Sequence, residues 1–595
     1  MPLSENALNI LKRRYLQRDE DNKLIESPEE MFQRVAKTVA SSDKLYNNNT
    51  DLQRTETEFF EMMYNLEFLP NSPTLMNAGR PLGQLSACFV IPIADSMEGI
   101  FEALKSSALI HKSGGGTGFS FSNLRPKGSS VKSTGGIASG PVSFMKLFNL
   151  STEIIKQGGK RRGANMGILK INHPDILEFI TCKFNNKELE NFNISVGLTE
   201  DFFRAVDADL DYDLISPHSN LVVKRLSATK VFNLIAETAW KSGDPGIVFI
   251  DRINEENPTP ELSKIESTNP CGEQPLLPFE SCNLGSINLS LMTKENNSTH
   301  GIDYDKLKNI IYEAVHFLDN VIDINKYPLP EIHEITLKTR KIGLGVMGFA
   351  DMLCKLGIPY NSDEAVTIAE KVMDYIHTQS KMASAELAKN RGSFPAFDKS
   401  IYKQKGIEYR NATTTTIAPT GTLSIIAGTS SGIEPLYALS YIRKAAEQEF
   451  IEVNPLFKAW VTEAGFHSNS FIQKISNAGS IQDIGEIPEE IRRIFVTAYD
   501  IGPEWHVKIQ AAFQKYTDNA VSKTVNLRNE ATIDQVKEVL KLAYKHKLKG
   551  ITIYRDESKD EQVLNIGEHL YKNHSTLIES LPNNSLCIDC EHDKM

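Results

Sequence analysis

The sequence predicts a large α/β protein built around a mainly parallel β-sheet, open or closed. Two observations predict this class. Short strand-like apolar runs alternate with amphipathic helical patterns over most of the chain, and 595 residues with 41% hydrophobic composition supply a large core. A helix between two strands carries the chain back to the same edge of the sheet, so successive strands run parallel.

Composition divides the chain into three stretches. Residues 1–65 form a polar helical region, in which the sequence from Ser27 to Glu30 marks a helix start. Residues 66–556 carry the alternating pattern of strands and helices. Residues 557–595 are charged and polar, and we expect them to form a flexible tail.

Within the middle stretch the expected elements follow from periodicity. One helix covers 305–323, and a second begins after Ser362 and ends at Gly392, with a capping residue in front and a glycine behind. The strand-like runs are 118–121, 194–198, 247–250, 413–417 and 551–554.

Composition also excludes several classes of protein. No apolar run approaches the roughly 20 residues that a membrane-spanning helix needs, and the basic N-terminus lacks the apolar stretch of a signal peptide. The net charge of −11 argues against a protein that tracks a polynucleotide. Seven cysteines without a secretion signal favour reduced thiols and a cytoplasmic location.

Cys271 lies in the most informative segment. Asn269, Cys271 and Glu273 occupy alternate positions, so their side chains share one face if the backbone is extended. Pro270 favours an extended backbone and cannot donate to a sheet ladder, which predicts an exposed loop. We expect an amide, a thiol and a carboxylate to point at one small volume.

The other cysteines divide by context. Cys182 and Cys354 lie in half-apolar helical segments, which is typical of packing. Cys88 and Cys282 taken singly also resemble core residues. Cys587 and Cys590 lie two residues apart in the polar tail, where they could form half of a zinc site, although a movable dithiol that reduces an interior disulfide is the better interpretation.

Glycine-rich segments supply a second signal. The segments 113–118 and 419–424 can bring backbone amides close to an anion, although each also fits a plain tight turn. Segment 158–163 places three cations between glycines, which suits phosphate or a solvated charge run. None of them has the sequence of a P-loop.

The sequence offers no clear metal centre. A di-iron site in a helical bundle needs two Glu-x-x-His pairs, and a helical example occurs only at Glu313 and His316. We expect His316 to lie at the polar edge of its helix instead.

Several long segments resemble the adenosylcobalamin-dependent, or class II, ribonucleotide reductases. They are QLSACF (84–89), HKSGGGTGFSFSNLRPKGS (111–129), GPVSFMKLFN (140–149), QGGKRRGANMG (157–167), NPCGEQ (269–274), SCNLGSINLS (281–290) and TTTIAPTGTLSIIAGTSSGIEP (414–435). The resemblance runs in order from Phe68 to the terminal cysteine pair. It implies a ten-stranded α/β barrel, two half-barrels of parallel strands around a central finger loop.

The resemblance also implies roles for the cysteines and their neighbours. Cys271 would be the thiyl radical that abstracts hydrogen from the ribose, with Glu273 as base and Asn269 as hydrogen-bond donor. Cys88 and Cys282 would supply two reducing equivalents and finish as a disulfide. The tail thiols Cys587 and Cys590 would reduce that disulfide and depend on a thioredoxin-like reductant.

The implied ligands are a ribonucleoside diphosphate and adenosylcobalamin, whose cobalt–carbon bond supplies the radical. Substrate phosphates are expected on the turn at 419–423. The substrate-binding residues implied are Ser72, Ala87, Gly115, Gly116, Pro419, Thr420, Gly421, Thr422 and Leu423.

The resemblance further implies a homodimer with a deoxynucleoside triphosphate effector. The effector residues would be Asn149, Lys160 and Arg161. Asn149 stands where relatives usually carry an Asp, and its amide can bond a hydroxyl but contributes no charge, so weaker effector specificity is expected. The N-terminal region is too short for an additional ATP-sensing cone.

Two other functions stay open from the sequence. A class I large subunit shares the barrel but receives its radical from a second subunit through adjacent tyrosines, and the chain has no Tyr-Tyr pair. A catalytically inactive nucleotide-binding regulator could keep the fold. The set of Cys88, Asn269, Cys271, Glu273 and Cys282 favours the enzyme, and no glycyl-radical motif is evident near the C-terminus.

Overall fold

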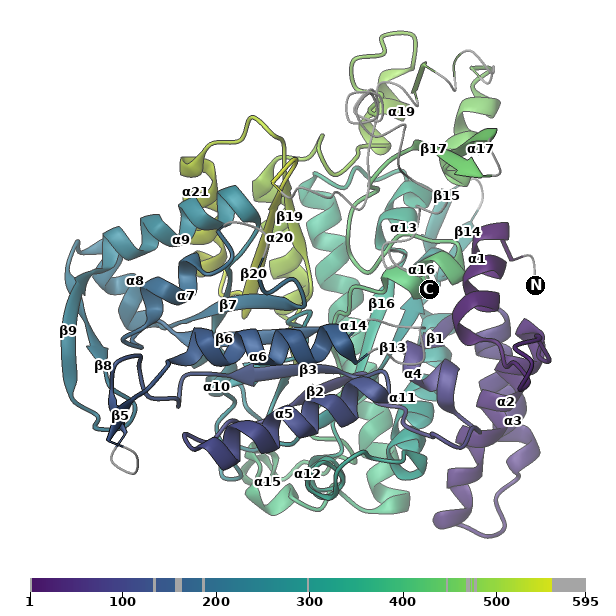
Figure 1. The fold of residues 1–595 in the computed structure, drawn as a ribbon. Helices are drawn as coiled ribbons and strands as arrows, with labels where there is room; N and C mark the ends of the chain where they lie inside the picture. Colours follow the sequence, from purple (N-terminus) through teal and green to yellow (C-terminus); the bar gives the residue numbers. More distant parts are fainter. Residues whose placement is uncertain are drawn as a thin grey trace.

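The computed structural model describes residues 3–131, 135–155, 163–184, 188–296, 299–445, 448–466, 471, 474–475 and 479–558. Its centre is a 10-stranded sheet that closes into a barrel (Figure 1). The predicted α/β barrel is confirmed.

The barrel consists of two groups of parallel strands. The first group contains β2 (Cys88–Val90), β3 (Gly116–Ser120), β6 (Asn165–Lys170), β7 (Phe192–Leu198) and β10 (Gly246–Phe249). The second contains β13 (Ser281–Asn288), β16 (Ile342–Met347), β19 (Thr524–Leu527) and β20 (Gly550–Arg555). The groups meet antiparallel twice, where β13 pairs with β2 and where β10 pairs with β20. These two seams separate the half-barrels.

Residues 413–417 complete the circle. Thr415 forms a parallel bridge with Leu344 of β16, and Ile417 forms one with Val521, just before β19. The run therefore lies where the sequence predicts a strand, but it makes isolated bridges instead of a continuous ladder. The short strand β1 (Phe68–Pro70) pairs antiparallel with the C-terminal part of β13.

Helices surround the barrel (Figure 1). The two predicted long helices are α11 (Tyr304–Ile324) and α14 (Asp363–Arg391), and α14 is capped by Ser362 and Gly392 as expected. The other longer helices are α5 (Met97–Lys112), α6 (Pro141–Ile154), α8 (Glu200–Asp207), α9 (Ala228–Ser242), α12 (Pro330–Thr339), α13 (Phe349–Leu356), α17 (Pro455–Glu463), α20 (Pro503–Gln514) and α21 (Ile533–Lys545). The shorter ones are α4 (Ser72–Asn77), α7 (Ile176–Thr181), α10 (Ile250–Glu255), α15 (Ile401–Lys405), α16 (Gly421–Ala427) and α19 (Glu489–Ile494).

Two-stranded ribbons decorate the barrel. They pair β4 (Ser130–Val131) with β5 (Gly136–Ile137), β8 (Asp211–Ile215) with β9 (Val222–Ser227), β14 (Thr293–Asn296) with β15 (Thr299–Ile302), and β17 (Ser440–Ala445) with β18 (Gln448–Val453). A fifth ribbon lies inside the barrel and carries Cys271.

The N-terminal region is helical, as predicted. It contains α1 (Glu5–Ile10), a π-helix (Leu11–Tyr15), α2 (Pro28–Ala40) and α3 (Leu52–Tyr64). Ser27 accepts from the Glu30 N–H while the Glu30 carboxylate accepts from the Ser27 N–H, a reciprocal cap that starts α2.

Buried charges join this region to the barrel. Asp319 on α11 is buried beside the guanidinium groups of Arg340, Arg391 and Arg410, at 2.8, 3.1 and 3.3 Å. Arg391 also lies 2.6 Å from Asp43, which follows α2. Each buried charge has an opposite partner, which such groups need once water is excluded.

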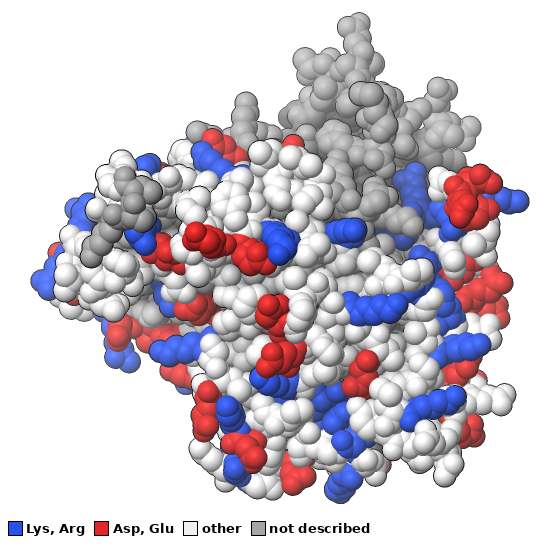
Figure 2. Space-filling model, turned by 60° about the horizontal axis from the view of Figure 1, so that its bottom comes forward, with Lys and Arg blue, Asp and Glu red and all other residues white. Residues whose placement is uncertain are grey.

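The surface mixes charges of both signs. On the face in Figure 2, lysines and arginines are interspersed with aspartates and glutamates. Among the described residues, no helix is both long and apolar enough to cross a membrane.

Candidate active site

Cys271 lies at the tip of a β-hairpin, the finger hairpin, formed by β11 (Ser267–Thr268) and β12 (Pro275–Leu276). Asn269 shapes the turn: its N–H donates to the Gln274 carbonyl at 3.1 Å, and its Oδ1 accepts from the Gln274 N–H at 3.0 Å. The predicted loop is present, but only its tip at Cys271 is exposed, because the residues on either side are buried inside the barrel. The predicted extended backbone is wrong, because Gly272 has a φ of 81° and the chain reverses there.

Glycines on the barrel strands, which have no side chain, let the finger hairpin enter the barrel. A Cβ on Gly118 of β3 would lie 1.7 Å from the Thr268 carbonyl oxygen, and one on Gly116 would lie 2.9 Å from the Pro270 ring. On the opposite half-barrel, a Cβ on Gly343 would lie 2.6 Å from Gln274 Nε2. Both half-barrels therefore touch the hairpin through glycine, which permits such close approach.

Hydrogen bonds from three directions fix the hairpin. The Glu273 carbonyl accepts from Thr416 Oγ1 at 2.9 Å and from the Ala520 N–H at 3.0 Å. Asn193 of β7 donates its Nδ2 to the Pro270 carbonyl at 2.8 Å. These contacts place the tip relative to the barrel strands, and Thr416 and Asn193 carry no sequence signal for this role.

Three of the other four predicted catalytic residues lie around Cys88. Asn269 Nδ2 donates to Cys88 Sγ at 3.1 Å, and Glu273 Oε1 lies 4.0 Å from the same sulfur. Cys88 and Cys282 are direct partners across the β2–β13 seam. Directly opposed residues of antiparallel strands have the Cα separation that a disulfide requires.

The thiols differ in exposure. Cys88 and Cys282 are buried and reduced, whereas the Cys271 side chain is exposed. Asn269 and Glu273 are each only 2% exposed. The structure thus brings a buried thiol pair, an amide and a carboxylate to the base of a hairpin whose tip carries the third thiol.

The surroundings of Cys282 hold it as a thiol. Burial raises its pKa well above the usual value, and the nearby Glu280 carboxylate adds to this. Its S–H points towards the carbonyl oxygens of Asn283 and Lys341, at 3.4 and 3.5 Å. Lys341 Nζ is 2.8 Å from Glu280 Oε2 in a fully buried ion pair. Sequence reasoning missed this pair, because neither residue lies in a recognisable motif.

The first glycine loop differs from the expectation of an amide-lined anion site. The N–H of Gly115 donates to the Ile110 carbonyl at 3.1 Å, and the N–H of Gly116 donates to the Ala87 carbonyl at 2.9 Å. A Cβ on Gly115 would lie 2.5 Å from the Phe89 ring. These glycines serve close packing, and their assignment to substrate binding stays a prediction.

The second glycine segment forms the turn before α16. Thr420 adopts a φ of 53°, which is unusual for a β-branched residue. Its Oγ1 accepts from the Gly432 N–H at 2.7 Å. The N–H groups at 421–423 are the first of α16 and have no acceptor within the helix. A Cβ on Gly421 would meet open space.

The predicted effector residue Asn149 lies on α6. Its Oδ1 accepts from the Asn191 N–H at 2.9 Å, so the side chain already has a partner within the chain. Leu150 and Ile154 on the same helix are 53% and 72% exposed. Lys160 and Arg161 lie outside the described residues, as do Cys587 and Cys590.

The remaining candidates pack as expected. Cys354 is buried in one hydrophobic core, and Cys182 is partly buried against a second one. His316 is half-buried at the edge of α11, with Nε2 2.8 Å from Asp43 Oδ1. No group of three His, Cys, Asp or Glu suited to a metal ion occurs among the described residues.

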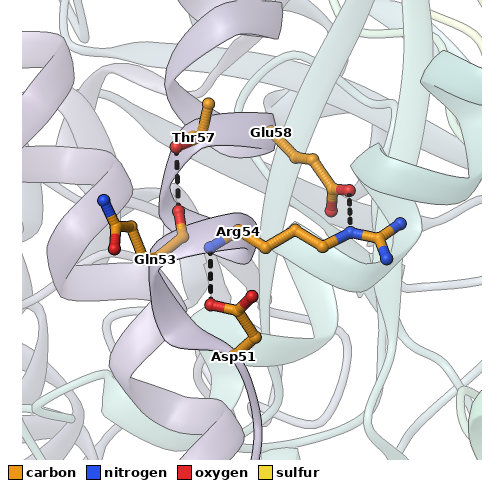
Figure 3. A pocket seen from close by; sticks show the side chains of 5 residues that line it. All are labelled: Asp51, Gln53, Arg54, Thr57 and Glu58. Carbon is orange, nitrogen blue, oxygen red and sulfur yellow. Dashed lines mark hydrogen bonds and ion pairs between the residues drawn. The ribbon is translucent and has the colours of Figure 1, made fainter.

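A depression of about 430 Å³ lies on α3, far from the cysteines in sequence (Figure 3). It is lined by Asp51, Gln53, Arg54, Thr57 and Glu58. Arg54 pairs with Glu58 at 2.8 Å and its side chain is 76% exposed. This is a solvated helix surface, and none of the predicted site residues line it.

Comparison with known proteins agrees with the fold. The model of the ribonucleotide reductase barrel domain matches residues 86–409 and 403–554, and that of the ribonucleotide reductase all-alpha domain matches residues 1–83. The α subunit of a class Id ribonucleotide reductase from Actinobacillus ureae has the same fold, with a TM-score of 0.77 at 24% identity, over 93% of this chain and 97% of that one.

Relatives with higher identity carry a more specific name. A vitamin B12-dependent ribonucleoside-diphosphate reductase of Thermoplasma acidophilum is 49% identical over 100% of this chain and 85% of its own. One from Mycobacterium tuberculosis is 46% identical over 95% of this chain and 81% of its own. With the half-barrels, the finger hairpin and the opposed thiols, these matches show that the chain belongs to the ribonucleotide reductase family, among its vitamin B12-dependent members.

Proposed function

We propose that this protein reduces ribonucleoside diphosphates to 2′-deoxyribonucleoside diphosphates and depends on adenosylcobalamin. One observation carries the proposal. Cys88 lies opposite Cys282 across a strand pair, and Asn269 and Glu273 contact Cys88 from the finger hairpin. A two-electron donor, a base and an amide donor are therefore held together at the finger hairpin that carries Cys271.

The electron balance assigns each group a step. A Cys271 thiyl radical takes the hydrogen atom at C3′, and Glu273 accepts the 3′-hydroxyl proton. The C2′–O bond then breaks and the oxygen leaves as water. Cys88 and Cys282 give up two electrons and two protons and form an S–S bond; one proton leaves with the hydroxyl as water and the other forms the new C2′–H bond. Glu273 returns its proton to the 3′-oxygen, and Cys271 returns its hydrogen atom to C3′. One disulfide and one water form per deoxynucleotide.

The cofactor supplies the initial radical when it is bound. The chain fits this requirement because Cys271 has an exposed thiol at the hairpin tip, while Cys88 and Cys282 are buried. The radical position is thus accessible, and the reducing pair is protected from solvent. Burial also keeps Cys282 protonated, as a hydrogen donor must be.

The ligand sites complete the proposal. The substrate phosphates bind the turn at 419–423 with help from Ser72. The N–H groups at the start of α16, which have no acceptor within the helix, suit an anion there. A deoxynucleoside triphosphate effector binds at α6 in a homodimer, and the exposed apolar residues Leu150 and Ile154 support that interface. A thioredoxin-like protein reduces Cys587 and Cys590.

We further propose domain limits of 1–65, 66–556 and 557–595. The boundary near residue 65 is supported by β1, which starts at Phe68 and already belongs to the barrel sheet.

A single-turnover experiment tests the function. Prereduced protein is mixed with adenosylcobalamin and ADP, without external reductant and without another subunit. We expect deoxyADP and, in a variant with Cys587 and Cys590 replaced by serine, a Cys88–Cys282 disulfide detectable by peptide mass spectrometry. A Cys271→Ser variant should bind ADP with unchanged affinity and form no product. Product formation only after addition of a second protein subunit would instead support a class I enzyme, and product from Cys271→Ser would refute the mechanism.

A further inference from the structure

A buried tyrosine from the N-terminal region reaches the proposed phosphate site. Tyr15 is 1% exposed, and its hydroxyl lies 2.7 Å from Ser72 Oγ. The ring is delivered by the π-helix Leu11–Tyr15, of which it is the last residue. Single π-turns are rare and frequently occur at functional sites.

The Ser72 hydroxyl is fixed relative to the reducing cysteines. Ser72 is the first residue of α4, directly after the capping residue Asn71. The Asn71 N–H donates to the carbonyl of Leu284 at 2.8 Å, and Leu284 follows Cys282 by two positions on β13. Ser72 remains partly exposed, so its hydroxyl can meet a ligand while Tyr15 holds it from the protein side.

A partly buried ion cluster secures the backbone of Tyr15. Arg80 Nη2 donates to the Tyr15 carbonyl at 2.7 Å and lies 3.0 Å from Glu26. The same Glu26 carboxylate lies 2.6 Å from Arg34, which donates to the Leu75 carbonyl of α4 at 3.2 Å. The cluster thereby ties the π-helix to α4. The preceding helix α1 packs against α16, which begins at the proposed phosphate turn.

We propose that Tyr15 is a positioning residue for the nucleotide phosphates. Its hydroxyl donates to Ser72 Oγ, which leaves the Ser72 O–H free to donate to a phosphate oxygen. The N-terminal region is then part of the substrate site as well as a helical cover. This inference rests on the proposed function, and specifically on Ser72 as a phosphate ligand.

Tyr15→Phe tests the contact because it keeps the ring and removes only the oxygen. A hydrogen bond that orients a ligand group contributes about 0.5–1.5 kcal/mol, so the KM for ADP should rise about 2- to 12-fold with kcat nearly unchanged. Calorimetric titration should show the same increase in the Kd of ADP and no change in the Kd of adenosine, which lacks phosphate. Ser72→Ala should have a similar effect, and the double variant should be no weaker than Ser72→Ala alone.

Tyr46→Phe is the matched control. Tyr46 also belongs to the N-terminal region, and its hydroxyl donates to Asp323 at 2.7 Å. This variant should lower the unfolding midpoint without changing the affinity for ADP, which separates loss of stability from loss of phosphate positioning.

Other binding results would contradict the inference, and each result identifies which part of it is wrong. If Ser72→Ala weakens ADP binding and Tyr15→Phe does not, Tyr15 has no positioning role although the function stands. Equal weakening of ADP and adenosine would show a general structural role. If neither variant affects ADP, Ser72 is not a phosphate ligand. If the parent protein binds ADP but shows no turnover, the proposed function fails, and the comparison of ADP with adenosine still decides the role of Tyr15.

Discussion

A methyl group at Gly118 would collide with the backbone of the finger hairpin. The Cβ of Gly118→Ala would lie 1.7 Å from the Thr268 carbonyl oxygen and 2.8 Å from its carbon, whereas ordinary contact begins at 3.4 Å. The hairpin or strand β3 must therefore move by about 1.7 Å (3.4 − 1.7). Thr268 directly precedes Asn269, so the displacement passes straight to the catalytic turn.

The expected loss follows from this distance. A misplacement of about 1 Å at a reacting group can reduce a rate about 100-fold. We therefore expect kcat/KM of Gly118→Ala to fall at least about 100-fold. Overpacking typically costs about 1–3 kcal/mol, so the free energy of unfolding should fall by a similar amount while the barrel still folds.

The assay compares the variant with Gly485→Ala. A Cβ on Gly485 meets no atom within 4 Å, so that control adds the same methyl group without a collision. Reduction of ADP with adenosylcobalamin and dithiothreitol gives kcat/KM, and urea denaturation gives the free energy of unfolding. If Gly118→Ala matched the control in both measurements, the hairpin would not be held inside the barrel by these glycines.

Three further predictions concern thiols and buried charges. In a variant lacking the two tail cysteines, iodoacetamide should label Cys271 well before Cys282, because Cys271 is exposed while burial raises the pKa of Cys282. Equal labelling rates, measured by mass spectrometry, would contradict this. Asp319→Asn should lower the free energy of unfolding by about 3–5 kcal/mol at pH 7, since it leaves buried arginines without their partner. Burial alone would raise the pKa of Asp319, but the three arginines lower that pKa from 3.8 to about 2. Ionised Asp319 therefore contributes about 2 kcal/mol to the free energy of unfolding above pH 4, and this contribution is lost as the pH falls towards 2. Urea denaturation across this range should show a smaller decline for the variant. Burial and neighbouring glutamates raise the pKa of Glu313 to about 7, so its ionisation destabilises the fold as the pH rises from 4.5 through 7. Glu313→Gln should therefore stabilise the protein at pH 8 and not at pH 4, and equal effects at both pH values would refute this.

The sequence predicted a structural element well where its limits depend only on neighbouring residues. The cap at Ser362 and the glycine at Gly392 predicted both ends of α14, because helix ends are set by residues within one turn. The run at 413–417 was placed correctly in the barrel wall, yet its pairing is reduced to isolated bridges, since pairing depends on distant strands.

The finger hairpin shows where local reasoning failed. Alternation at Asn269, Cys271 and Glu273 predicted a shared face, but that inference assumes an extended chain. The turn arises from hydrogen bonds between Asn269 and Gln274 and from glycines on strands that are distant in the sequence. In the glycine loop before β3, the glycines make room for the hairpin and for Phe89, which no local pattern indicated, and their part in substrate binding stays a prediction.

By itself, the sequence determined the class of fold, the limits of the long helices and the candidate reactive side chains, because residue type and short-range spacing encode these directly. Only the tertiary structure decided that Cys88 opposes Cys282, that Glu280 pairs with Lys341 beside them, and that Tyr15 meets Ser72. Such contacts join residues far apart in the chain, and barrel closure, which no local pattern records, brings them within reach.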